Sequence, residues 1–138
     1  MKQTTIAPAD DLHHLLDDLV DRVSEAELAV LLSADGVALV ASRTVTEEAA
    51  TLVAAAAAGL HALAAAAGRQ IHGGDALRTI VEMEHVLLVV EPAGDAALLA
   101  VTFTGAPDPE VVNEPVAETA ERARRVLAAR GRTGGEAR

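Results

Sequence analysis

The chain has 138 residues, of which 51% are apolar and one is aromatic; it has no cysteine and a formal net charge of −10. This length is typical of one domain with its own core, and the apolar content excludes a generically disordered chain. The absence of cysteine excludes disulfides and thiolate metal sites and, with no signal-like apolar segment at the start, favours a cytoplasmic location.

The charge is unevenly distributed along the chain. Residues 1–121 hold 5 basic and 20 acidic side chains, whereas residues 122–138 hold 6 arginines and one glutamate. Because an acidic body repels phosphate backbones, we expect no nucleic-acid partner. The arginine-rich end has two interpretations: a contact for an acidic partner, or the favourable C-terminus of a helix that frays into solvent.

An amphipathic helix is the first predicted element, after a flexible segment at residues 1–9. Asp10 and Asp11 can cap its start. Apolar side chains then recur every three or four residues from Leu12 to Val23, which is the spacing of one helix face. The folded domain is therefore predicted to begin at residue 10.

A β-hairpin is predicted next. Two apolar runs flank Asp35-Gly36, a pair that tolerates the positive φ angles of a tight turn. The predicted strands cover residues 28–33 and 37–42.

The segment after Thr46 is rich in alanine and allows three interpretations. Residues 49–68 carry no formal charge, so they could form a membrane span, a low-complexity tract or a closely packed helix. Only four residues favour insertion strongly, worth roughly −2 kcal/mol together, and His61 opposes it. Alanine is also the strongest helix former, the hydroxyl of Thr46 can cap a helix, and Glu47 and Glu48 suit its first turn. We therefore predict an ordered helix and no membrane span.

Three strands are predicted after Gly73-Gly74. Residues 77–83 alternate between apolar and polar side chains, as in a half-exposed strand. Residues 86–90 and 96–103 are continuously apolar, as in strands that are covered on both faces.

A last helix completes the predicted domain, which spans residues 10–130. Because Pro115 fits poorly inside a helix, we predict that the regular part begins near Asn113 or Glu114. Gly131 is predicted to end the helix, and residues 131–138 are predicted to be a disordered tail.

The alanine-rich helix has more apolar surface than one sheet can cover. We predict that its seam of Leu52, Leu60 and Leu63 lies on the sheet, and that its small side chains contact a second copy of the chain. The half-exposed strand would pair with its twin, since an open edge is an aggregation hazard. Coverage by another element of the same chain is the alternative. The predicted dimer interface comprises Ala50, Ala54, Ala57, Ala58, Gly59, Ala65, Arg78, Ile80 and Glu82.

Several segments together resemble the roadblock/LC7 family, especially bacterial members encoded beside small Ras-like GTPases. These segments are "LDDLVDRV", "AVLLSADGVALVAS", "AAGLHALA" and "TIVEME", within a likeness that covers about residues 12–126. The resemblance implies a profilin-like α+β fold of order αββαβββα. Its five-stranded antiparallel sheet would carry the first and last helices on one face and the long helix on the other. It also implies a homodimer formed through the long helix and the third strand, and association with a small Ras-like GTPase.

No catalytic constellation is found in the sequence, so we expect no enzyme and no cofactor. A phosphate-binding loop that ends in Gly-Lys-Ser/Thr is absent, so the chain is not itself such a GTPase. For His13 and His14, pairing with Asp17 and Asp18 is favoured over metal binding. His61 near a two-fold axis could make dimerisation depend on pH.

The predicted function is that of a non-catalytic homodimeric regulator or scaffold for a small Ras-like GTPase. Its expected partner-binding residues are Glu47, Glu48, Thr51, His61 and Arg69. Arg69 is the one candidate for a catalytic arginine offered to the GTPase, although a solvated helix end is favoured for it. A small-molecule sensor of profilin-like or PAS-like architecture is the alternative function, and it requires a pocket between the sheet and the helix.

Overall fold

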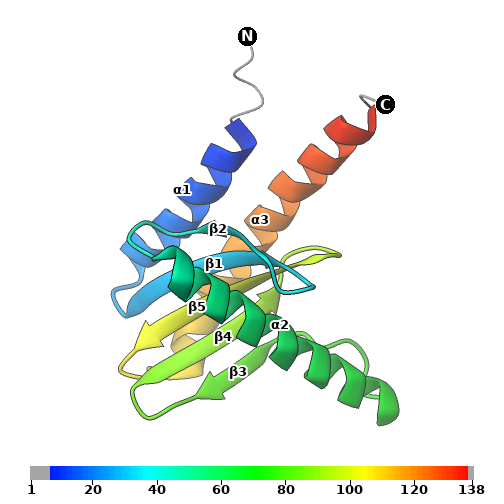
Figure 1. Cartoon of the computed structure of the whole chain (residues 1–138). Coiled ribbons are helices and arrows are strands. Elements are labelled where there is room, and N and C mark those ends of the chain that lie inside the picture. Colours follow the sequence, from blue (N-terminus) through cyan, green and yellow to red (C-terminus); the bar gives the residue numbers. More distant parts are fainter. Residues whose placement is uncertain (1–6, 137–138) are drawn as a thin grey trace.

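The computed structural model describes the backbone of residues 7–136 and the side chains of residues 11–130. A helix is followed by two strands, a helix, three strands and a helix, which confirms the predicted order (Figure 1). The elements are α1 Ala7–Arg22, β1 Ala26–Ser33, β2 Ala38–Ala41, α2 Glu47–Gln70, β3 Thr79–Glu82, β4 Val86–Pro92, β5 Ala97–Thr104 and α3 Pro109–Glu136.

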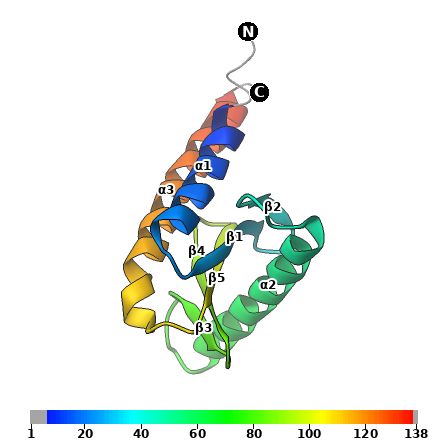
Figure 2. The ribbon, with the colours of Figure 1, turned by 90° about the vertical axis from the view of Figure 1, so that its left-hand side faces the viewer.

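The strands form one antiparallel sheet in the order β2-β1-β5-β4-β3. The short strands β2 and β3 are its edges, and the strands β1, β5 and β4 lie between them. Figure 2 shows α1 and α3 together on one side of the sheet and α2 on the other. This arrangement confirms the α+β fold that the family resemblance implies.

Each face of the sheet carries its own apolar core. On the side of α1 and α3, leucines of α1 and the fully buried Phe103 fill the space. On the α2 side, the sheet contributes large side chains, namely Val30, Leu32, Leu88, Val90 and Leu98. The residues of α2 that are buried against them are all alanines.

Local signals at the turns agree with the predictions. Gly36 in the β1–β2 turn has a φ of +97°, which suits glycine because it lacks a Cβ. The Oγ1 of Thr46 accepts a hydrogen bond from the N–H of Ala49 at 3.1 Å and so caps α2. The hairpin turn and the start of α2 therefore lie where short-range chemistry requires them.

The predicted bounds of the outer helices are wrong. Helix α1 already begins at Ala7, before the predicted caps, while residues 1–6 of the predicted flexible segment lie outside the described residues. Helix α3 begins at Pro109, because Asp108 caps it by accepting the N–H of Glu110 at 3.0 Å. The helix includes Pro115 and continues past Gly131 to its end at Glu136.

The segment that enters α2 is tied to α1 by Arg43. Its backbone N–H donates to Asp17 at 2.7 Å, and its guanidinium donates to Asp21 at 2.8 Å. The hydrogen bond with Asp21, followed by the charges of Asp21 and Asp17, raises the pKa of Arg43. Because these groups are exposed, the contact positions the start of α2 more than it stabilises the fold.

Candidate partner-binding surface on helix α2 and strand β3

Helix α2 has a buried face and an exposed face. The buried face consists of Ala50, Ala54, Ala57 and Ala58, which are 0–8% exposed and lie on the sheet. The opposite face is exposed and almost entirely apolar. We call it the outer stripe; it consists of Leu52, Ala55, Ala56, Gly59, Ala62, Leu63 and Ala66.

This arrangement reverses the predicted orientation of α2. Leu52 and Leu63, predicted to lie on the sheet, are 66% and 71% exposed, and of that seam only Leu60 packs against the core. The four buried alanines, predicted to contact a second copy, cover the sheet of their own chain instead. The large side chains on this face of the sheet already fill the space, so only small side chains let the helix approach closely.

Gly59 lies at the centre of the outer stripe and has no evident role within its own chain. A Cβ built on this residue meets no atom within 4 Å. A glycine inside a helix costs about 1 kcal/mol relative to alanine, so its presence calls for a reason. Within the described residues, nothing uses the space that the missing side chain leaves.

Strand β3 forms the second part of the surface. In the described sheet it pairs only with β4, so its other edge is open. Ile80 is 40% exposed and Glu82 is also exposed, which confirms a half-exposed strand. Arg78 is different, because its Nε donates to Glu91 at 2.8 Å on the neighbouring strand. Of the three residues predicted here for the dimer interface, Arg78 is thus already paired within the chain.

The residues predicted to bind a partner fall into two groups in a single copy. Glu47, Glu48 and Thr51 surround a shallow depression at the start of α2. His61 and Arg69 line a separate pocket beside its second half, together with Ala65 from the predicted interface. Arg69 lies 22 positions after Glu47, which corresponds to about 33 Å along the helix. One copy alone does not bring these groups together.

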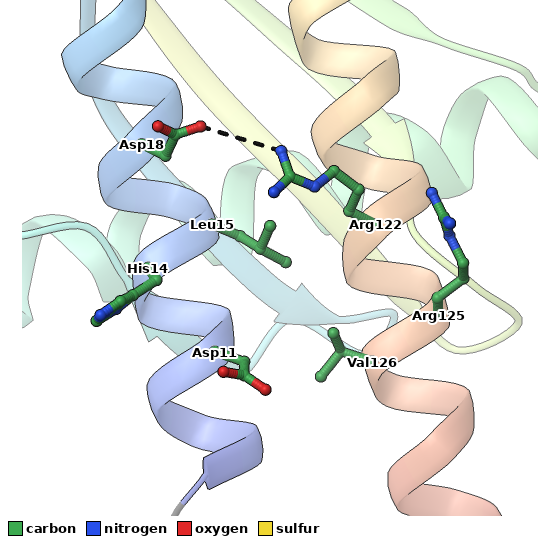
Figure 3. A pocket seen from close by; sticks show the side chains of 7 residues that line it. All are labelled: Asp11, His14, Leu15, Asp18, Arg122, Arg125 and Val126. Atoms are coloured by element: carbon green, nitrogen blue, oxygen red, sulfur yellow. Dashed lines mark ion pairs between the residues drawn. The ribbon is translucent and has the colours of Figure 1, made fainter.

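A further cleft lies elsewhere, between α1 and α3 (Figure 3). It has a volume of about 670 Å³ and is lined by Asp11, His14 and Asp18 from α1 and by Arg122 and Arg125 from α3. Arg122 lies 4.0 Å from Asp18 across the cleft. The acidic side of α1 thus faces the basic side of α3, and the charges of the lining partly satisfy one another.

The predicted pairs of the two neighbouring histidines on α1 are not formed. His13 and His14 are exposed, while Asp17 and Asp18 contact Arg43 and Arg22 instead. Across the part of the chain that the structure describes, no group of three histidine or carboxylate side chains is placed to hold a metal ion.

Fold and surface together define a small α+β domain whose distinctive features are an apolar helix stripe and an open strand edge. The family model of the Roadblock/LC7 domain matches residues 12–103, and the chain belongs to this family. No curated protein sequence gives a significant match.

Solved structures support the same assignment. A Roadblock/LC7 domain from Streptomyces avermitilis is 33% identical, with a TM-score of 0.78 over 84% of this chain and 97% of that one. The gliding protein MglB from Thermus thermophilus is 20% identical, with a TM-score of 0.77 over 87% and 90%. Profilin II from Acanthamoeba castellanii is 14% identical, with a TM-score of 0.60 over 82% and 96%. The last two show a shared fold alone, which confirms the profilin-like architecture.

Helix α2 is also, among the described helices, the one whose length and composition would allow it to cross a membrane. Its most apolar window has a mean hydropathy of 1.7, and 22% of that window is buried. Such a helix is weak evidence of a span, because helices that cover a sheet can have the same composition. Here four of its alanines lie on the sheet.

Proposed function

We propose that this protein is a non-catalytic, homodimeric regulator or scaffold that binds a small Ras-like GTPase and modulates its nucleotide cycle or its localisation in the cytoplasm. The observation that carries the proposal is the outer stripe of α2, which is apolar, exposed and centred on a glycine. Membership of the Roadblock/LC7 family supports the choice of partner, since the chain resembles bacterial members encoded beside such GTPases.

The outer stripe is nearly symmetric about Gly59. Leu52 lies seven residues before Gly59 and Ala66 seven residues after it, so two antiparallel copies that cross at Gly59 would place each leucine against an alanine. In the same way, Leu63, four residues after the glycine, would face Ala55 of the other copy, which lies four residues before it. Small side chains at the crossing let two helices approach closely. Burying each leucine contributes about 1.5–3 kcal/mol, which favours a second copy as the cover.

Charge supports the same pairing. Glu48 lies eleven residues before Gly59 and Arg69 lies ten after it, so the crossing would bring the carboxylate of one copy near the guanidinium of the other. It would also join the two groups of predicted partner-binding residues, because the start of each α2 would meet the end of its twin. A docking surface for the GTPase would then exist at each end of the helix pair. The open edges of β3 would pair as well and extend the sheet across the dimer.

The proposed effect on the GTPase is positional. A small Ras-like GTPase has switch loops whose order depends on the bound nucleotide, and a rigid helix pair can stabilise one arrangement of them. Arg69 is the one arginine of this surface that could reach a transferring phosphoryl group. If the Arg69→Gln variant still stimulates GTP hydrolysis, the stimulation comes from ordering of the switch loops.

The direct test uses a small Ras-like GTPase encoded in the same genome, loaded with GDP or with a non-hydrolysable GTP analogue. We expect calorimetry to show binding that depends on the nucleotide, and Glu48→Lys to weaken it at least tenfold. Glu110→Lys, an exposed charge reversal in the first turn of α3, is the matched control and should bind normally. Absence of binding in both nucleotide states, for every such GTPase of that genome, would refute the proposed partner.

A further inference from the structure

A pocket of about 360 Å³ lies beside the second half of α2, on the flank away from the outer stripe. It is bounded by α2, by the loop that follows α2, and by the turn between β4 and β5. Its polar lining includes His61 and Arg69 from the helix, Asp75 from the loop and Asp95 from the turn. The volume lies within the range of small-molecule sites.

Backbone hydrogen bonds fix the walls of this pocket. Just after the end of α2, His72 has a φ of +57°, and the N–H of Gly73 donates to the carbonyl of Gly68 at 2.7 Å. This six-residue closure holds the loop against the helix end. On the opposite wall, the N–H of Ala93 donates to the carbonyl of Ala97 at 2.9 Å and closes the β4–β5 turn. The pocket is therefore formed before any ligand arrives, which lowers the entropic cost of binding.

The arginine of this pocket has no ion pair, which is unusual among the arginines that the structure describes. Between residues 11 and 130, six of the eight arginines lie within 4.0 Å of a carboxylate. Arg69 has no such partner in that range, although Asp75 and Asp95 line the same pocket. These two aspartates form no ion pair there either. The pocket thus presents a cation and two anions that do not neutralise one another directly.

His61 adds a buried polar atom without a partner. Its Nδ1 is inaccessible to solvent and has no hydrogen bond among the described residues. A buried polar atom that lacks a partner costs about 1–3 kcal/mol. If the imidazole turns toward the pocket, this nitrogen can donate or accept according to tautomer, so a ligand that carries both a donor and an acceptor would satisfy it.

We propose that this pocket binds a free α-amino acid. The ligand carboxylate would pair with Arg69 and the ammonium group with Asp75 and Asp95, and either group could bind His61 Nδ1 once the imidazole has turned toward the pocket. Two carboxylates in the lining disfavour phosphate-bearing ligands, and the charged walls disfavour lipids. The site uses no residue of the outer stripe, although His61 and Arg69 also belong to the proposed GTPase-docking surface. The test therefore measures amino-acid binding with no GTPase present, so that its failure and the failure of the proposed partner are separate results.

The test is calorimetric titration of the full chain with each of the twenty free amino acids. We expect at least one to bind with a micromolar to low-millimolar Kd and to raise the Tm. The analogue of that amino acid without its carboxylate, and the analogue without its ammonium group, should each bind at least tenfold more weakly. Arg69→Gln and Asp75→Asn should each reduce the affinity at least tenfold, with a circular dichroism spectrum that is unchanged because both side chains are exposed.

Arg130→Gln is the matched control, since Arg130 is also exposed and has no ion pair between residues 11 and 130. We expect this variant to bind the amino acid normally. The proposal is overturned if none of the twenty amino acids binds, or if Arg130→Gln weakens binding as much as Arg69→Gln does. Neither result bears on the proposed dimer, which is tested separately by the mass of the protein in solution.

Discussion

The two long faces of α2 are built from nearly the same residue types but have opposite environments. The fully covered residues of the inner face are all alanines and lie on the sheet with Leu60 partly buried beside them, whereas the outer stripe carries Leu52 and Leu63 and is exposed. On hydrophobicity alone the leucines should be inside. The difference shows that side-chain size, set by the large residues on the opposing sheet, decided the orientation of the helix.

That comparison also separates two kinds of stability. The inner face contributes to the fold of one chain, because its alanines are buried whether or not another copy is present. The outer stripe contributes little within one chain, and its leucines gain burial only through a second molecule. Substitutions on the two faces should therefore alter different measured quantities.

The largest effect is expected when a leucine is placed on the inner face. Ala54 is fully buried, so Ala54→Leu must push α2 away from the sheet, at a cost of about 1–3 kcal/mol. For a domain of this size, we expect the Tm to fall by about 5–15 °C in a calorimetric scan. Ala56→Leu, two residues away on the outer stripe, is the matched control and should keep the Tm of the isolated chain. Equal losses in the two variants would mean that the faces do not differ as described.

A charge on the outer stripe should separate the proposed dimer without unfolding the chain. In Leu63→Arg, two leucines are lost from the interface, which should raise the dimer Kd by about 100-fold or more. Light scattering over a dilution series measures this change, and circular dichroism checks the fold. Val111→Arg, on an exposed valine of α3, is the control and should leave the Kd unaltered. If Val111→Arg dissociates the dimer and Leu63→Arg does not, the interface lies on α3.

The smallest effect is expected at Gly59, where one substitution should stabilise the single chain and weaken the dimer. Gly59→Gln should stabilise the isolated helix by about 0.5–1 kcal/mol, because glutamine is a better helix former. The same side chain should weaken the dimer, since it would occupy the helix crossing. Chemical denaturation at low protein concentration measures the first change, and the dilution series measures the second. A dimer that tolerates glutamine at this position would place the crossing elsewhere on α2.

Much of this fold can be predicted from short-range signals. The Asp35-Gly36 turn, the Thr46 cap and the change to a two-residue period near β3 each depend on local chemistry, and each is confirmed. The family resemblance then supplies the sheet and the side on which each helix lies. The start of α3 was also available from local chemistry, because Asp108-Pro109 combines a cap with a proline at the first helical position. The prediction missed it by giving more weight to Pro115.

The orientation of α2 could not be predicted from periodicity. A helix that is apolar around nearly its whole circumference has no preferred face in a pattern of apolar and polar residues. A comparison of sizes could have found it, since large residues such as Leu32 and Val90 on the opposing sheet require small ones on the helix. The pocket beside His61 could not be predicted from the sequence either. Asp75 and Asp95 come from two loops that only the folded chain brings to the same helix.

Cover of the outer stripe by a second copy is the basis of the proposed dimer and of its docking surface. Sedimentation equilibrium of the purified chain at micromolar concentration tests it most directly. We expect a mass of about 28 kDa, twice the 14.1 kDa of one chain, and a single chain mass for Leu63→Arg under the same conditions. A wild-type mass of 14.1 kDa at that concentration would contradict the proposed dimer and the GTPase docking surface built from its two helices.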